Sequence, residues 1–303
     1  MKSLRAWIRN RRWAKTAKLW GREHSGPSED YAYWMAIERV MEWVNLKVSG
    51  HRRIWPLSWF LMSLPQEVVP VRYALSVGCG PGNLEREVIR HGSALRIRGI
   101  DVSPKSLEIA RKLAQEAGCG DRVEYRQSDA EEWLQHLEEE PDIDIIFFHA
   151  SLHHIESLES VLSLCAKRLR QGNPGLLYVD EYIGPSRNEW NPEHLEYAAS
   201  LFERIPAEFR VAAELGPPVA YDDPTEMIRS SEIETVLRET FEITEYRPYF
   251  GNVVMPLVSG IRSGALQDDR IQALLNEAME LEDNLAARGL IQPLYAVFVG
   301  RAR

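Results

Sequence analysis

The stretch ALSVGCGPG at residues 74–82 decides the fold of this chain. It is an apolar run that ends in a glycine-rich turn, and a helical pattern of apolar residues follows at once. Such a strand–turn–helix unit lets backbone N–H groups and the first turn of a helix approach a nucleotide-like ligand closely. Asp101 ends the next apolar run, where a carboxylate can hold both hydroxyls of a ribose. The two features together predict a cofactor that carries a ribose.

The spacing of the glycines separates two classes of cofactor. A dinucleotide fingerprint reads G-x-G-x-x-G, and its third glycine lets the helix pack closely while the pyrophosphate lies at the helix N-terminus. This chain has Gly78, Gly80 and Gly82, and Asn83 takes the place of the third fingerprint glycine. The segment resembles motif I of the class I SAM-dependent methyltransferases, and the resemblance extends from about residue 70 to the end. It implies S-adenosylmethionine (SAM), which has no pyrophosphate, as the cofactor.

Apolar runs and helical patterns alternate after the turn. Strands are expected at 72–77, 95–101, 123–127, 144–148, 176–179, 241–249 and 294–299, with helices between most of them. This alternation predicts an α/β fold with a doubly wound, Rossmann-like sheet and a ligand at the carboxyl ends of the strands. The resemblance implies seven strands, of which the last is antiparallel.

The chain is expected to have an N-terminal basic and helical cap over residues 1–70 and a SAM-binding domain over residues 71–303. The alternation breaks after the fifth strand, where several prolines lie in a stretch of about 183–230. We interpret that stretch as an insertion that forms the wall of the substrate pocket.

The predicted cofactor site combines the turn with the ends of the following strands. Its residues are Gly78, Cys79, Gly80, Gly82, Asp101, Val102, Asp129, Ala130 and His149. The resemblance implies that Asp129 accepts from the adenine amino group with Ala130 beside the ring, and that His149 lies beside the methionine tail. The alternatives are that Asp129 is an ordinary helix N-cap and that His149 is a packed core residue.

The run FFHASLHHI at 147–155 resembles the segment after the fourth strand of methyltransferases that act on small molecules. His153 is the candidate base for a hydroxyl acceptor, or else a loop contact, since histidine titrates near neutral pH. The resemblance implies that His154 ties the loop down by hydrogen bonds. Glu181 and Tyr182, after the fifth strand, are predicted to orient the acceptor, to act as base or to stack on it, unless both are rim residues.

Two further expectations concern the same region. Arg187 and Trp190 either reach an acidic or planar group of the substrate or pack the inserted helix. No catalytic metal is expected, because the Asp and Glu residues near the site do not have the sequence spacing of metal ligands.

The charge of the chain is uneven. Residues 1–22 carry eight Lys or Arg and no acid, which leaves 28 basic against 45 acidic residues in the remainder. Such an acidic body repels nucleic acid, so a small-molecule partner is predicted. The basic segment, with its three tryptophans, is either a helix in peripheral contact with an anionic membrane or an arm that covers the site. If the N-terminal helices cover the site, Tyr31, Tyr33 and Trp34 would supply aromatic faces near the sulfonium; otherwise they are plain hydrophobic helix contacts.

Cysteines and hydropathy bear on the compartment. Cys79, Cys119 and Cys165 are scattered without metal-ligand spacing, which indicates a reducing environment. The chain has no run of 18 apolar residues. A cytoplasmic location is predicted, with the inner membrane surface as the alternative.

The leading hypothesis is SAM-dependent O-methylation of a small molecule or of a glycan-linked or lipid-linked intermediate. N- or C-methylation of a small metabolite is the alternative within this class. An NAD(P)-binding oxidoreductase and a non-catalytic, membrane-recruited binding protein are the alternatives outside it. The sequence predicts neither the acceptor nor the oligomeric state.

Overall fold

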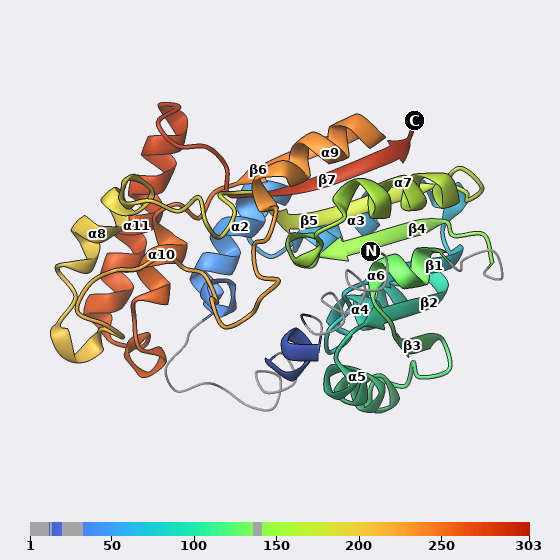
Figure 1. Cartoon of the computed structure of the whole chain (residues 1–303), viewed down its shortest axis with the longest axis horizontal. Coiled ribbons are helices and arrows are strands. Elements are labelled where there is room, and N and C mark those ends of the chain that lie inside the picture. Colours follow the sequence, from blue (N-terminus) through green and yellow to red (C-terminus); the bar gives the residue numbers. More distant parts are fainter. Residues whose placement is uncertain (1–11, 13, 20–32, 136–140) are drawn as a thin grey trace, which may run out of the picture.

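A seven-stranded sheet forms the centre of the computed structural model, which describes residues 12, 14–19, 33–135 and 141–303 (Figure 1). The strands are β1 (Val71–Val77), β2 (Ala94–Asp101), β3 (Val123–Gln127), β4 (Ile145–His149), β5 (Leu176–Tyr182), β6 (Phe241–Tyr249) and β7 (Tyr295–Ala302). Their order is β3-β2-β1-β4-β5-β7-β6. Neighbours pair in parallel except at β7, which is antiparallel to both β5 and β6. The prediction of a doubly wound sheet with an antiparallel last strand is confirmed.

Helices connect most of the strands. The α-helices are α2 (Glu38–Ser49), α3 (Pro56–Ser63), α4 (Asn83–His91), α5 (Pro104–Glu116), α6 (Ala130–Gln135), α7 (Leu158–Leu169), α8 (Glu196–Phe202), α9 (Ile233–Thr240), α10 (Val254–Ser259) and α11 (Asp269–Ala287). Short 3₁₀ turns are η1 (Trp34–Ala36), η2 (Gln66–Val68), η4 (Leu152–His154), η5 (Pro192–Leu195), η6 (Ala207–Phe209), η7 (Ser230–Glu232) and η8 (Ser263–Ala265). A further short helix covers 14–19.

The two faces of the sheet bury different sets of helices. Alternate side chains of a strand point to opposite faces, so Ala74 and Leu75 of β1 enter different apolar cores. Helices α2 to α5 pack in the first core, and α6, α7 and α9 pack in the second. Helices α2 and α3, from the predicted cap, therefore belong to the same core as the sheet.

Helices α8, α10 and α11 gather at the left of Figure 1, beyond the end of the sheet toward which the arrow of β4 points. The buried carboxylate of Glu282 in α11 accepts backbone N–H groups of Gly251, Val253 and Val254 at the start of α10. The insertion joins this group through a salt bridge of 2.5 Å between Arg204 and Glu277. The prediction missed α10 and the way in which the insertion packs on the C-terminal helices.

The strand order places a switch in chain direction between β1 and β4. The chain leaves β1 toward β2 on one side, and β4 starts the run toward β5 on the other. Ligands of doubly wound sheets bind outside the carboxyl ends of the strands at such a point. The glycine turn after β1 and the histidine segment after β4 both lie there.

None of the described helices is long and apolar enough to cross a membrane. Of the predicted basic segment 1–22, the structure describes only residues 12 and 14–19. The predicted aromatic contact of Tyr31 also lies outside the described residues.

Candidate active site

Three glycines in the left-handed region build the turn between β1 and α4. The φ angles of Gly78, Gly80 and Gly82 are 72°, 51° and 75°, which a residue with a side chain adopts only with strain. A Cβ on Gly78 would lie 2.5 Å from the Cβ of Ser151. The turn therefore requires glycine and packs directly against the loop after β4.

The carboxylate of Asp101 fastens this turn to the end of β2. Its Oδ2 accepts the N–H of Gly80 at 2.9 Å, and its Oδ1 accepts the N–H of Ser103 at 2.7 Å. The two oxygens have about four acceptor positions between them, which leaves room for a further donor such as a sugar hydroxyl. The predicted ribose contact thus fits the chemistry of this group.

Cys79 and Val102 contribute mainly backbone and packing to the turn. The N–H of Cys79 donates to the carbonyl of Ile100 at 3.0 Å, and its side chain fills the space beside Gly99. Burial raises the pKa of the Cys79 thiol well above its ordinary value, so the thiol stays protonated. The carbonyl of Val102 accepts from the side chain of Gln127 at 3.3 Å.

Asp129 follows β3 and caps the next helix. Its Oδ1 accepts the N–H of Glu132 at 2.8 Å, which is the N-cap contact of α6. Ala130 is half-buried against the second core. The N-cap alternative is therefore formed, and the contact of Asp129 with an adenine ring stays a prediction.

His149 lies at the carboxyl end of β4 with 51% of its side chain exposed. Its Nδ1 is 3.5 Å from Oδ2 of Asp180 on β5, and Oδ1 of Asp180 accepts the hydroxyl of Tyr249 at 2.7 Å. Partial burial opposes a charge on the ring, but Asp180 outweighs it and raises the pKa of His149. This pair places a proton-binding ring at the switch point.

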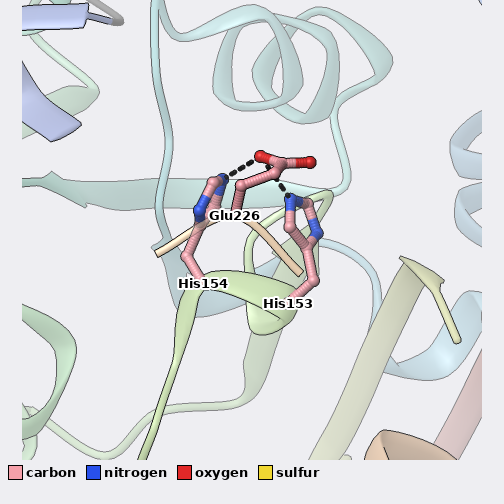
Figure 2. A group of neighbouring side chains, drawn as sticks. All are labelled: His153, His154 and Glu226. Carbon is pink, nitrogen blue, oxygen red and sulfur yellow. Dashed lines mark ion pairs between the residues drawn. The ribbon is translucent and has the colours of Figure 1, made fainter. Parts of the chain in front are cut away.

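The adjacent residues His153 and His154 face Glu226 in a buried group (Figure 2). The Nε2 atom of each ring is 3.8 Å from Oε2 of Glu226, and the ring centroids are 4.2 Å apart. Only 10% of each histidine side chain and 12% of the glutamate side chain are exposed. We call the following six residues the histidine cluster: His153, His154, Glu181, Asp223, Thr225 and Glu226.

Glu181 holds His153 in place from β5. Its Oε1 is 2.6 Å from Nδ1 of His153 and accepts the N–H of Tyr182 at 2.7 Å. Its Oε2 accepts the N–H groups of Ser151 and Leu152 at 2.7 and 2.6 Å. Burial opposes ionisation, but the His153 ring and these donors outweigh it and lower the pKa of Glu181. The ionised carboxylate fixes both the imidazole and its loop.

His154 is held from the opposite side by the insertion. Its Nδ1 is 3.0 Å from the hydroxyl of Thr225 and 3.8 Å from Oδ2 of Asp223. The hydroxyl of Thr225 in turn donates to Oδ1 of Asp223 at 2.8 Å. Thr16 of the helix at 14–19 also donates to Oδ1 of Asp223, at 2.7 Å. The described part of the N-terminal segment therefore packs onto the histidine cluster.

The two rings differ in protonation. Burial opposes a charge on His153, but Glu181 outweighs it and raises the pKa of His153 to about 9. Burial and the neighbouring His153 lower the pKa of His154 to about 3, so that ring is neutral.

Two strained residues flank the histidine cluster. Ala150 and Met227 have φ angles of 50° and 48°, in the left-handed region that favours glycine. Each costs about 1 kcal/mol or more, and strain of this kind concentrates at functional sites. The N–H of Ile228 donates to the carbonyl of His153 at 3.0 Å and so ties the two strained segments together.

Arg187 positions the segment that carries Glu226. Its guanidinium donates to the carbonyls of Asp223 and Tyr221 at 2.6 and 3.1 Å. The sequence predicts that Arg187 contacts a group of the substrate or packs the inserted helix. In the structure its guanidinium N–H groups donate to backbone carbonyls of the insertion. Trp190 is half-buried and packs against the first core, which matches its packing alternative.

Tyr182 lies in an aromatic group rather than at a rim. It is buried, and its hydroxyl donates to the carbonyl of Pro185 at 3.0 Å. Its ring meets Tyr295 edge-on at 5.2 Å, and Tyr295 stacks on Tyr249 at 5.2 Å. Trp34 packs on Tyr295 from the N-terminal side at 5.2 Å, while Tyr33 is 46% exposed.

Glu85 in the first turn of α4 is buried below the glycine turn. Neither of its carboxylate oxygens has a hydrogen-bond partner of normal geometry among the described residues. Burial raises the pKa of Glu85 to about 7, and the nearby Ser76 hydroxyl opposes this shift only in part. A proton on this carboxyl therefore stabilises the folded chain.

The replacement of Glu85 by glutamine should change how stability depends on pH. Because the folded pKa is the higher one, the contribution of Glu85 is complete below its ordinary pKa of 4.5 and is lost as pH rises to about 7. Between pH 5 and pH 7.5 the free energy of unfolding of the wild type should fall relative to Glu85→Gln by roughly 2 to 3 kcal/mol. Urea denaturation of both chains at the two pH values measures this. Parallel pH profiles would contradict it.

Sequence reasoning missed Glu85, Asp223, Thr225 and Glu226. The acids and threonine of the insertion stand in the run DDPTE at 222–226. An acidic run beside a proline is common in solvent-exposed loops, so this run gave no indication that its residues lie near the histidines. Only the fold brings it to His153 and His154.

A separate cavity of about 510 Å³ opens at the amino ends of β1, β2 and β3. Its lining includes Arg72, Arg96 and Arg98. The glycine turn and the histidine cluster lie at the opposite edge of the sheet, so this cavity is not part of the site.

Comparison with known proteins agrees with this architecture. Residues 74–172 match the model of a family described as a methyltransferase domain. The match covers the glycine turn, Asp101 and the two histidines, and it ends before β5 and the insertion.

Curated relatives match part of the chain. A ubiquinone biosynthesis O-methyltransferase of Aliivibrio fischeri (strain MJ11) is 36% identical over 99 residues, which are 32% of this chain and 39% of the relative. The protein of that name from Pectobacterium carotovorum is 31% identical over 154 residues, which are 50% and 62% of the two chains. This chain thus spans less than two thirds of the length of each of these two relatives.

A solved structure of geranyl diphosphate methyltransferase, in complex with GPP and sinefungin, has the same fold. It superposes with a TM-score of 0.50 at 14% identity, over 85% of this chain and 81% of the other.

Proposed function

Residues 74–172 form a methyltransferase domain of the class I SAM-dependent type, and from this premise we propose that the chain O-methylates a small molecule. The observation that carries the proposal is the tie between the glycine turn and Asp101. The N–H of Gly80 is bound by a carboxylate whose oxygens keep acceptor positions for a ribose. The O-methyl assignment follows the names of the curated relatives.

The cofactor would be held by the turn and the strand ends. Gly78, Cys79, Gly80 and Gly82 supply a backbone that approaches closely, and Asp101 with Val102 binds the ribose. Asp129 and Ala130 border the adenine, and His149 lies on the side of the methionine tail. When bound, SAM would supply a methyl group on a positively charged sulfur. A hydroxyl oxygen can attack the methyl carbon in line with the carbon–sulfur bond, so that the sulfur leaves as a neutral thioether.

The acceptor would lie at the carboxyl ends of β4 and β5, beside the half-exposed ring of His149. The buried aromatic group of Tyr182, Tyr249 and Tyr295 lies near the end of β5, and an apolar aromatic environment favours a hydroxylated aromatic acceptor. We propose that His149, oriented by Asp180, removes the hydroxyl proton, because this ring is half exposed at the strand end. That His153 is the base stays a prediction, since both of its nitrogens face carboxylates.

Residues around the site would exclude water and shape the pocket. The insertion at 183–230 carries the segment held by Arg187, and the helix at 14–19 contacts it through Thr16. These contacts support a covering role for the N-terminal segment over membrane contact. Cytoplasmic location is part of the same proposal.

Incubation of the full chain with methyl-labelled SAM and a panel of hydroxylated aromatic compounds tests the function. Label is expected in an acid-stable methyl ether, and calorimetry should show SAM binding without NAD binding. Label on nitrogen or carbon would move the assignment to the alternative acceptor atom. Tight NAD binding without SAM binding would contradict the proposal.

A further inference from the structure

We propose that His153, His154 and Glu226 bind a divalent transition-metal ion, and that the rest of the histidine cluster orients these ligands. The inference concerns metal binding by this chain and holds whether or not methyl transfer is its reaction. It differs from the expectation drawn from the sequence, where the acids showed no ligand spacing.

The donor atoms are of the type that zinc-like ions prefer. Two imidazole nitrogens and one carboxylate oxygen converge, and all three lie within 4.8 Å of one another. In a tetrahedral site, two ligands that are each about 2.1 Å from the ion are about 3.4 Å apart. The Nε2–Oε2 distances of 3.8 Å must therefore close by about 0.4 Å, and the widest pair by up to about 1.4 Å. Mg²⁺ and Ca²⁺ prefer oxygen ligands, so two imidazoles favour a transition metal.

The second nitrogen of each ring is already held by an acceptor. Nδ1 of His153 is bound to the Glu181 carboxylate at 2.6 Å, and Nδ1 of His154 is bound to the Thr225 hydroxyl at 3.0 Å. Once the ion has displaced the proton from Nε2 of His153, both rings keep their proton on Nδ1 and have a lone pair on Nε2. Metal-binding histidines are oriented in this way by carboxylates and other acceptors. Both lone pairs then point toward Glu226 (Figure 2).

The distances from the two Nε2 atoms to Oε2 of Glu226 fit a cation shared by the three atoms better than direct hydrogen bonds. At 3.8 Å, the Nε2 atoms are too far from Oε2 for hydrogen bonds. The neutral Nε2 of His154 and a carboxylate oxygen are also both acceptors. A cation between them would bind all three atoms and offset the cost of placing the Glu226 carboxylate in a largely buried group.

The backbone holds the ligands from two independent segments. The histidines follow the strained Ala150, and Glu226 precedes the strained Met227. Strain on both sides indicates that the surrounding contacts over-determine these positions. Thr16 covers the cluster through Asp223, so an ion bound here would be shielded from bulk water on that side.

Metal content and metal titration of the full chain test the proposal. The purified chain is stripped with a chelator and titrated with Zn²⁺ by calorimetry, and the bound metal is counted by elemental analysis. We expect one ion per chain. Replacement by Co²⁺ should give the visible absorption of a nitrogen- and oxygen-ligated ion. The variants His154→Ala and Glu226→Gln should bind Zn²⁺ at least about 100-fold more weakly.

Two further variants separate a metal site from a folding effect. Thr225→Val removes the acceptor at Nδ1 of His154 and should weaken binding by about 10- to 100-fold with the Co²⁺ spectrum altered. His194→Ala removes a histidine outside the cluster and should leave affinity unchanged. The proposal is overturned if the wild type takes up no stoichiometric ion. It is also overturned if His154→Ala and Glu226→Gln, folded by circular dichroism, bind Zn²⁺ as the wild type does.

Discussion

Replacing Asp101 with alanine should weaken SAM binding at least about 100-fold and abolish methyl transfer. The carboxylate holds the N–H of Gly80 at 2.9 Å and is proposed to accept two ribose hydroxyls. Each hydrogen bond to a charged group contributes about 1.5 to 3 kcal/mol, and a tenfold change in affinity corresponds to about 1.4 kcal/mol. Calorimetric titration with SAM measures the loss directly.

Two controls separate this contact from damage to the turn. Asp101→Asn keeps one oxygen acceptor and should bind SAM with intermediate affinity. Asp121→Ala changes an exposed acid in the loop before β3 and should bind as the wild type does. If Asp101→Ala retains its affinity for SAM, the cofactor site has been assigned to the wrong residue.

Replacing Glu181 with alanine should lower the free energy of unfolding by about 3 to 5 kcal/mol, or prevent folding. The buried carboxylate accepts the N–H groups of Ser151, Leu152 and Tyr182 and binds His153. Its removal leaves buried donors and a buried imidazole without their partner. Urea denaturation followed by tryptophan fluorescence gives the value.

A glutamate on another strand provides the comparison. Glu245 of β6 pairs with Arg247 at 3.0 Å at the surface, where both side chains are 44% exposed. Glu245→Ala should cost at most about 1 kcal/mol. Equal losses for the two variants would show that Glu181 does not hold the loop in the way described.

Much of the sheet could be predicted because local pattern determines it. The strand Val123–Gln127 and the helix Asp269–Ala287 have the predicted bounds, since turn residues and apolar periodicity mark their ends. The positions of Asp101 and the glycines at the turn could be predicted because they depend on one short strand–turn–helix unit, and the ribose contact of Asp101 stays a prediction. The antiparallel β7 followed from the family resemblance.

The histidine cluster could not be predicted as a unit. Glu226 reaches His153 only because the insertion folds back and Arg187 holds its backbone. No local period records such a long-range contact. The role of Glu181 was seen only in part, because alternation along β5 directs it away from Asp180 and toward His153.

The close packing of Gly78 against Ser151 has a consequence for kinetics. The Ser151 hydroxyl donates to the carbonyl of Val77 at 2.7 Å, and its N–H is bound to Glu181, which holds His153. The glycine turn and the histidine loop are therefore joined directly by packing and hydrogen bonds. A ligand that settles into the turn therefore also affects the position of the histidine loop. Steady-state measurements are accordingly expected to show compulsory order, with the cofactor entering first and leaving last.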